Sequence, residues 1–372
     1  MMLEKQRQEA GDNSQQIQAG TVIINNGIDE KRAREIVDEK LGEVICGYTQ
    51  EARAVAKERM DLFANDLIPR LVKNNLLEEL KDPSIQIILS EAQKSAASTE
   101  RVADYALLSE LLIHRVKNGF NRNTRAGINR AVKIVDEITD ESLLGITVAY
   151  AVSQWIPVSG ILNDGLDILN SLFGKIIYAT LPRGREWLEH LDVLDAIRID
   201  SFGSLKKIEQ YYSEILSGYI DVGIDKTSEN YQIAMKLAKE ADLPDDILCD
   251  HELRQGFVRL PIVRIDKLDL LSVIRQQKII IDGQEVIIPI KFELTDIQKE
   301  SIKKIYALYS NDTELKSQNI SRFIEKWDEY DNLRNLKAWW DEIPLSYTIT
   351  PVGRVLAQAN AQRCDPNLPA LD

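Results

Sequence analysis

The sequence predicts a mainly α fold: a helical bundle with a long N-terminal helix, followed by a small β-hairpin and a winged-helix-like C-terminal domain. Three observations predict this class. Aromatic residues make up only 6% of the 372 residues, and 11 prolines are spread along the chain. Apolar residues recur at intervals of three and four over most of the length, as on one face of a helix. Runs of β-branched residues are concentrated in residues 246–292.

The N-terminal region predicts a polar tail, a short strand and a long helix. Residues 1–20 are rich in Gln, Glu, Asn and Gly, so we expect them to be disordered. In region 21–74 a β-branched run at 21–24 precedes a helix of roughly 40 residues, which Pro69 bends or ends. The apolar face of this helix consists of Val37, Leu41, Val44, Tyr48, Ala52, Val55, Ala56, Met60, Phe63 and Leu67.

A single strand beside so long a helix predicts self-association. The backbone groups of residues 21–24 need hydrogen-bond partners, and one short strand cannot bury its own apolar side chains. Copies of the same segment would meet both needs, so we expect a homo-oligomer. The alternatives are that residues 21–24 pair with a hairpin of the same chain, or remain disordered. The predicted oligomerisation residues are Ile17, Val22, Ile23, Ile24, Val37, Leu41, Val44 and Tyr48.

Residues 75–245 predict a bundle of shorter helices joined by short loops. Within them, residues 142–163 contain no charged side chain, which by length alone is compatible with a membrane span. Pro157 and Gly160 break this run, and the first of the two resulting helices is too short to cross a bilayer. We therefore expect a buried central helix pair; a membrane role for residues 143–181 is the alternative.

Residues 246–292 predict a β-containing linker or hairpin, because Asp282 and Gly283 separate two runs rich in Ile and Val. Asp-Gly is a preferred two-residue hairpin turn. Residues 293–372 then show three helical patterns, an extended run at 346–349 and a closing helical pattern. This is the order of elements in a winged helix, which predicts a C-terminal domain of that kind.

Two stretches resemble known families. The start, GDNSQQIQAGTVII, and the end, TPVGRVLAQANAQR, resemble an uncharacterised bacterial family that carries GDNSxxIQAG and TPVGRxLAxAN segments around a helical middle. This resemblance implies no activity. Residues 82–146, which include DPSIQIILSEAQKSAAS and DYALLSELLIHRVKNG, resemble helical domains of the abortive-infection alpha type, found in bacterial proteins linked to phage defence. The second resemblance implies a helical domain and a setting in phage defence.

The cysteines and one histidine are candidate metal ligands. Cys46, Cys249 and Cys364 are far apart in the sequence, so neither a disulfide framework nor a zinc cluster is indicated. Glu186 and His190 are four residues apart on one helical face, which is a spacing of metal-ligand pairs. Their neighbours form the polar side of an amphipathic helix, and we therefore favour a solvated face.

The other two histidines also favour structural roles. His114 lies near a helix C-terminus, where a cation is favoured by the helix dipole. His251 follows Cys249 by two residues, but no third catalytic group or oxyanion signature accompanies this pair. Phosphate-binding loops and the nucleophile elbow are absent from the sequence. We predict no catalytic residues, no cofactor and no metal, and hence a protein that is not an enzyme.

Charge indicates which partners are disfavoured. The net charge of −13 and the pI near 5.0 disfavour nucleic acid and anionic membranes. Residues 293–363 contain nearly equal numbers of basic and acidic residues, whereas a DNA reader brings several cations to the phosphates. The third helix of this region offers candidate partner-binding residues. The two tryptophans among them either contact another protein or lie buried in the core. These residues are Arg334, Lys337, Trp339 and Trp340.

The sequence favours a non-enzymatic helical oligomer that acts as a sensor or scaffold. The N-terminus lacks the apolar core of a secretory signal, so we expect the protein in the cytoplasm. Self is the expected partner, with another protein as a candidate for the C-terminal domain. One alternative function is a membrane-damaging effector that uses residues 143–181. The other is a winged-helix transcriptional regulator that uses residues 293–363.

Overall fold

The computed structural model describes residues 27–200, 202–270, 272–281 and 284–369, and between 269 and 292 only the backbone. Fifteen α-helices lie in these residues, which confirms the mainly α class. In chain order they are α1 Glu30–Ile45, α2 Gln50–Lys73, α3 Pro83–Ser98, α4 Val102–Asn118, α5 Arg122–Lys133, α6 Asp140–Gln154, α7 Leu162–Ile176, α8 Glu186–Val193, α9 Ile208–Ile215, α10 Ser217–Ile220, α11 Glu229–Glu240, α12 Asp296–Tyr306, α13 Thr313–Asp328, α14 Asp331–Asp341 and α15 Pro351–Cys364. Two short 3-10 helices are η1 Leu77–Lys81 and η2 Ile265–Leu270.

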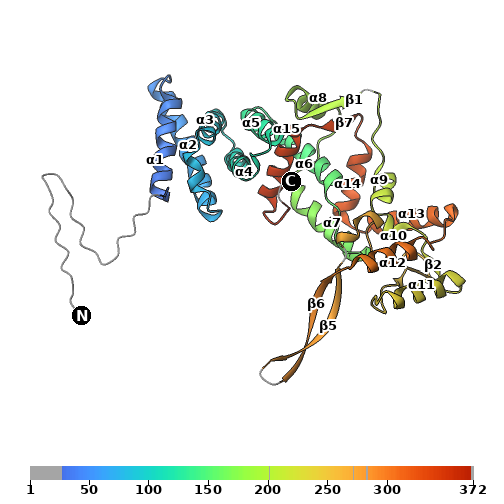
Figure 1. Ribbon diagram of the computed structural model, residues 1–372. Coiled ribbons are helices and arrows are strands. Elements are labelled where there is room, and N and C mark those ends of the chain that lie inside the picture. The colour runs from blue at the N-terminus through green and yellow to red at the C-terminus, as the bar shows by residue number, and fades with distance from the viewer. Residues whose placement is uncertain (1–26, 201, 271, 282–283, 370–372) are drawn as a thin grey trace, which may run out of the picture.

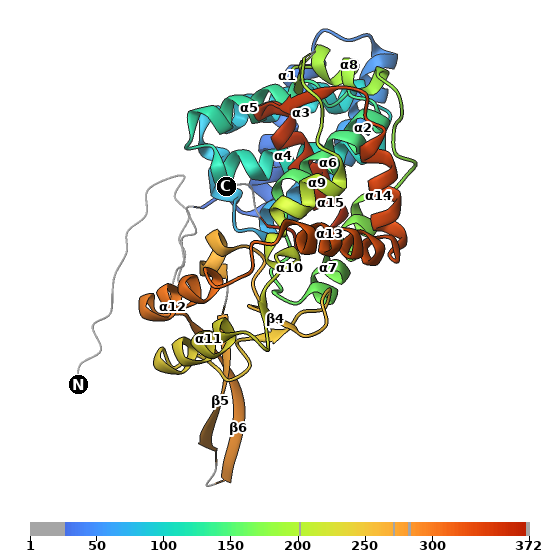
Figure 2. The same ribbon diagram turned by 90° about the vertical axis from the view of Figure 1, so that its right-hand side faces the viewer.

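The described strands form three small antiparallel sheets. In the first, β1 Ile197–Asp200 pairs with β7 Ser346–Ile349. In the second, β4 Phe257–Arg259 lies between β2 Ile224–Asp225 and β3 Cys249–Asp250. The third is a hairpin of β5 Ser272–Ile281 and β6 Gln284–Glu293, at the position that the sequence predicts; its turn lies outside the described residues. Figures 1 and 2 both show this hairpin extending away from the helical body.

The single long N-terminal helix predicted from the sequence is wrong. Helix α1 ends at Ile45 and a second helix begins at Gln50. The side chain of Thr49 accepts a hydrogen bond from the backbone of Ala52, so Thr49 is the N-cap of a new helix. Helix α2 packs against α1, α3 and α4. Pro69 lies inside α2, which continues to Lys73. The predicted strand 21–24 and tail 1–20 lie outside the described residues.

Most helices pack into one main apolar core, with α6 and α15 at its centre. Every residue of α6 from 142 to 152 is buried, and so is the stretch of α15 from 355 to 361. A helix that is apolar around its whole circumference needs neighbours on all sides. Helix α15 obtains them from α4, α5 and α6 (Figure 1). Among the described residues, none of the helices is long and apolar enough to cross a membrane.

The predicted winged-helix domain is not found in the described residues 293–369. Strand β7 pairs with β1, roughly 150 residues earlier in the sequence, rather than with a neighbouring strand. Helix α15 enters the centre of the main core, while α12 packs against α11 in a separate, smaller core. The order of elements is that of a winged helix, but β7 and α15 pack against elements from earlier in the chain. The apolar surface of α15 is buried inside the bundle rather than within a C-terminal domain.

The TPVGR segment, residues 350–354, connects β7 to α15 and lies very close to the backbone of residues 195–196. Thr350 caps α15 by accepting a hydrogen bond from the Gly353 backbone at 3.2 Å, and its hydroxyl donates to the carbonyl of Asp195 at 2.6 Å. A Cβ atom on Gly353 would lie 2.0 Å from the carbonyl oxygen of Ala196. Glycine is therefore required here by the close approach of two backbones.

The smaller core is built between Ile224 and Tyr309, from α11, α12, η2 and the β2–β4–β3 sheet. A buried ion pair connects it to the main core. The guanidinium of Arg259, which is fully buried, donates to both carboxylate oxygens of Glu252 at 2.7 Å. The same guanidinium donates to the carbonyl oxygen of Gly160, which precedes α7 of the main core, at 2.9 Å.

Substitution of Gly353 tests the close approach at the start of α15. We expect Gly353→Ala to lower the free energy of unfolding by about 1–3 kcal/mol, the usual cost of overpacking. Denaturant unfolding of the full chain measures this change. The matched control is Gly42→Ala in α1, where a Cβ atom meets nothing within 4 Å; we expect a gain of up to about 1 kcal/mol there. Equal effects of the two substitutions would contradict the assignment.

Candidate functional site

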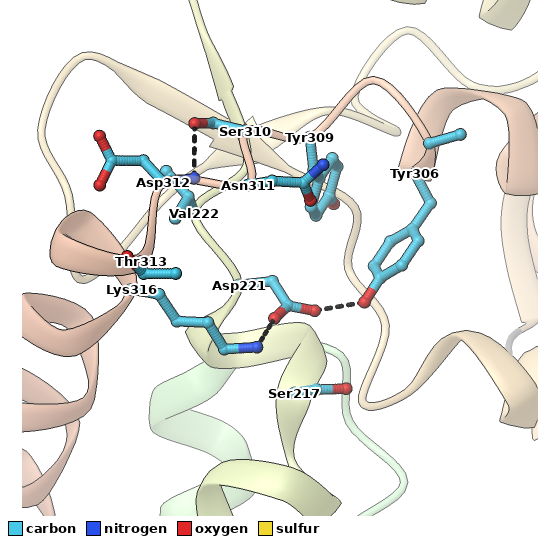
Figure 3. A pocket seen from close by; sticks show the side chains of 11 residues that line it. Ser217, Asp221, Val222, Tyr306, Tyr309, Ser310, Asn311, Asp312, Thr313 and Lys316 are labelled. Atoms are coloured by element: carbon cyan, nitrogen blue, oxygen red, sulfur yellow. Dashed lines mark hydrogen bonds and ion pairs between the residues drawn. The ribbon is translucent and has the colours of Figure 1, made fainter.

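A polar cavity lies where the smaller core meets the main core. Its volume is about 570 Å³, within the usual range for small-molecule sites. Its walls come from α10, the segment 221–222, the end of α12, the loop 307–312 and the first turns of α13. Figure 3 shows these residues around a central carboxylate. The lining residues are Ser217, Asp221, Val222, Tyr306, Ala307, Tyr309, Ser310, Asn311, Asp312, Thr313 and Lys316.

The carboxylate of Asp221 binds one group from each core. The ammonium of Lys316, on α13 of the main core, donates to one carboxylate oxygen at 2.7 Å. The phenol of Tyr306, on α12 of the smaller core, donates to the other oxygen. The Asp221 side chain is 13% exposed and that of Lys316 is 44% exposed. The carboxylate is therefore nearly buried, whereas the Lys316 side chain is partly exposed. Figure 3 shows the carboxylate between the Lys316 ammonium and the Tyr306 hydroxyl.

The backbone of Asp221 is held by a buried histidine. Nε2 of His251 donates to the carbonyl of Asp221 at 2.9 Å, and Nδ1 accepts the backbone N–H of Leu253 at 3.2 Å. One donor and one acceptor describe a neutral imidazole. Burial lowers the pKa of His251 to about 4, which keeps it neutral. His251 is thus a structural support of the site.

The arrangement suits binding rather than covalent chemistry. Burial and the neighbouring Asp221 carboxylate raise the pKa of Tyr306 above its ordinary value, so the phenol remains a donor. Burial also raises the pKa of the Cys249 thiol, whose sulfur donates to the carbonyl of Arg259 at 3.2 Å; this disfavours a reactive thiolate. The Asp312 side chain already caps α13 by accepting from the backbones of Glu314 and Leu315.

The predicted partner-binding tryptophans are core residues. Trp339 and Trp340 are 4% and 5% exposed. Their indole N–H groups donate to the carbonyls of Pro182 and Lys206. Of the two interpretations left open by the sequence, burial is therefore correct. Arg334 is exposed and pairs with Asp331, while Lys337 pairs with Asp328.

The predicted oligomerisation residues divide into three groups. Val37 and Leu41 are buried inside their own chain. Val44 is half-buried and Tyr48 is 38% exposed. The third group lies outside the described residues and consists of Ile17, Val22, Ile23 and Ile24.

The other histidines are also placed by the structure. His190 on α8 accepts the backbone N–H of Thr139 at 3.4 Å, and the described residues contain no group of three or more potential metal ligands. The expectation of a cationic His114 at a helix end is wrong. His114 is buried, its Nε2 bonds to the side chain of Gln362, and burial lowers its pKa.

No pattern in the sequence predicts the cavity itself. Asp221, Tyr306 and Lys316 are separated by up to 95 positions, and each belongs to an ordinary amphipathic or loop segment. Only the packing of the smaller core onto the main core brings them together.

These features define a mainly helical protein with a candidate binding site between two cores. The chain belongs to the family whose model, described as “:-like”, matches residues 27–369. This membership is consistent with the resemblance of the chain to an uncharacterised family. No curated protein and no solved structure matches the chain.

The low pKa of His251 predicts a stability that depends on pH. Between about pH 6.5 and pH 4 the unfolded chain binds a proton that the folded protein excludes. The neutral His251 therefore makes its full contribution to the free energy of unfolding above pH 6.5. This contribution, about 3 kcal/mol in total, is lost as the pH falls toward 4. Denaturant unfolding across this range should give a shallower pH dependence for His251→Gln than for the unchanged chain. Parallel curves would show that His251 is not the group responsible.

Proposed function

We propose that this chain is a non-enzymatic, cytoplasmic, self-associating helical protein that acts as a sensor or scaffold. The polar cavity between the two cores is called the junction cavity below. The observation that carries the proposal lies in this cavity, where the Asp221 carboxylate accepts hydrogen bonds from both Lys316 and Tyr306. A polar ligand that binds Lys316 or Tyr306 in place of Asp221 changes the connection between the cores. A ligand shifts a conformational equilibrium only through such differential contacts.

Self-association has a candidate surface on α2. The buried face of this helix includes Met60, Phe63 and Leu67. On another face Val55 and Leu62 are each 48% exposed. Their spacing of seven residues is two helical turns, which places them on one side of the helix, as in a coiled-coil seam. A second helix packed along this side would remove both from water.

Phage defence is the proposed setting, on the resemblance of residues 82–146 to abortive-infection alpha domains. The two alternative functions receive less support. A membrane-damaging role for residues 143–181 would require α6 to leave the main core, where its residues 142–152 are buried. A regulator that binds DNA through residues 293–363 would lack a separate winged-helix unit, because α15 packs within the bundle.

The sensor part of the proposal is tested by loosening the junction. We expect Tyr306→Phe to leave one carboxylate oxygen of Asp221 without its donor and to favour opening of the smaller core. A hydrogen bond to a charged group contributes about 1.5–3 kcal/mol, so amide hydrogen exchange in β2, β4, α11 and α12 should accelerate roughly tenfold or more. Exchange in α4, α6 and α15 should stay unchanged.

The matched control for this experiment is Tyr231→Phe. Tyr231 lies on α11 of the smaller core and is half-buried, and its hydroxyl has no hydrogen bond to another described residue. We expect no acceleration in this variant. If Tyr306→Phe also left the smaller core fully protected, Asp221 would not connect the two cores.

The assembly part is tested by light scattering at micromolar concentration. We expect a mass several times the 42.3 kDa of one chain, falling to about one chain in the double variant Val55→Glu, Leu62→Glu, because charge on an apolar interface opposes association. Both sites are exposed, so the fold should be kept. Ile87→Glu is the control, since Ile87 on α3 is 67% exposed and lies outside the α2 surface. A monomeric unchanged chain would refute self-association.

A further inference from the structure

A second cavity, distinct from the junction site, lies beside the TPVGR segment. Its volume is about 620 Å³, and it is bounded by the end of α6, residues 204–206, α9, α14, β7 and the first turn of α15. Its surface is mostly apolar. The apolar lining comes mainly from Ala149, Leu205, Tyr211, Ile215, Trp340 and Ile349.

One wall of this cavity is aromatic and fixed in position. The rings of Tyr211 and Trp340 lie 6.0 Å apart, inclined by 38°. The indole N–H of Trp340 donates to the carbonyl of Lys206 at 2.9 Å, so this donor is already occupied. The wall therefore offers ring faces and apolar atoms, which favour a flat, apolar partner.

The charged side chains that line the cavity are two cations and one anion. Lys206 and Glu214 pair with each other at 2.6 Å, so their charges compensate. Arg354 is exposed, and its guanidinium makes no ion pair or hydrogen bond to any other described residue. The capping of α15 by Thr350 fixes the backbone of Arg354 at the cavity. One uncompensated cation thus lies beside an apolar space.

We propose that this cavity binds a small amphipathic molecule with a flat apolar body and one acidic group. The body occupies the space beside Tyr211 and Trp340, and the acidic group pairs with Arg354. A guanidinium matches the planar arrangement of two oxygens in carboxylate, sulfonate or phosphate groups. The volume lies within the range of small-molecule sites, which combine apolar walls with few polar groups. This inference does not depend on the proposed function of the junction cavity.

Two fluorescent probes of the same shape test the proposal in the full chain. Anilinonaphthalene sulfonate has a flat aromatic body and one acidic group, and N-phenylnaphthylamine has the body without the acid. We expect saturable binding of both. Arg354→Gln should weaken the sulfonate probe about fivefold, the size of a partly exposed charge pair, and leave the uncharged probe unchanged. Ser153→Trp, at an exposed lining position, should weaken both probes by obstructing the cavity.

The controls separate this site from general charge and from the junction cavity. Arg122→Gln removes the same charge from an exposed position on α5 and should not affect either probe. Tyr306→Phe should also leave probe binding unchanged. Unfolding curves confirm that each variant keeps its fold. Equal weakening of the sulfonate probe by Arg354→Gln and Arg122→Gln, or full binding of both probes by Ser153→Trp, would overturn the proposal.

Discussion

The buried ion pair between Arg259 and Glu252 is the constraint on which the arrangement of this protein depends. Burial alone would raise the pKa of Glu252, yet Arg259 holds it below its ordinary value, so the pair is charged at neutral pH. Arg259 also lies over the ring of Tyr219 at 5.4 Å, and Glu252 accepts the backbone N–H of Leu162 at the start of α7. A buried charge without its partner is costly, so the ion pair favours the observed position of residues 249–259, from β3 to β4, against α7 and α10.

The junction cavity follows from this position. With residues 249–259 in this position, His251 donates to the carbonyl of Asp221. The carboxylate of Asp221 then faces Tyr306 of α12 on one side and Lys316 of α13 on the other (Figure 3). The Arg259 side chain is fully buried, whereas the Lys316 side chain that pairs with Asp221 is 44% exposed. The connection between the cores is therefore buried at one point and accessible to solvent at another. Proteins that respond to ligands commonly combine the two, because a response needs both a fixed frame and a contact that can be exchanged.

Local patterns predicted much of the helical content, since apolar spacing and caps act over a few residues. The burial of residues 142–152 in α6 follows from the absence of charged side chains in that stretch, and the β5–β6 hairpin follows from the Asp-Gly pair between two β-branched runs in the sequence. Contacts between residues far apart in the sequence could not be predicted in this way. The sequence predicts an extended run at 346–349, but its pairing with β1 depends on the packing of the whole bundle. The apolar spacing does not indicate the break between α1 and α2, because Tyr48 and Val55 continue the apolar stripe across it. The three charged and phenolic groups of the candidate site meet only through tertiary packing.

Helix α15 lies at the centre of the bundle although it follows in the sequence every element that it contacts. Asn360 donates to the hydroxyl of Thr147 across 213 positions, and Gln362 bonds to His114 across 248. A chain interrupted before Pro351 would leave a hollow lined by α4, α5 and α6, with apolar surface open to water and buried polar groups unpaired. Protein quality control recognises such exposed surface. The position of this helix thus makes the exposed interior a mark of incomplete synthesis, since the bundle is closed only after α15 has been made.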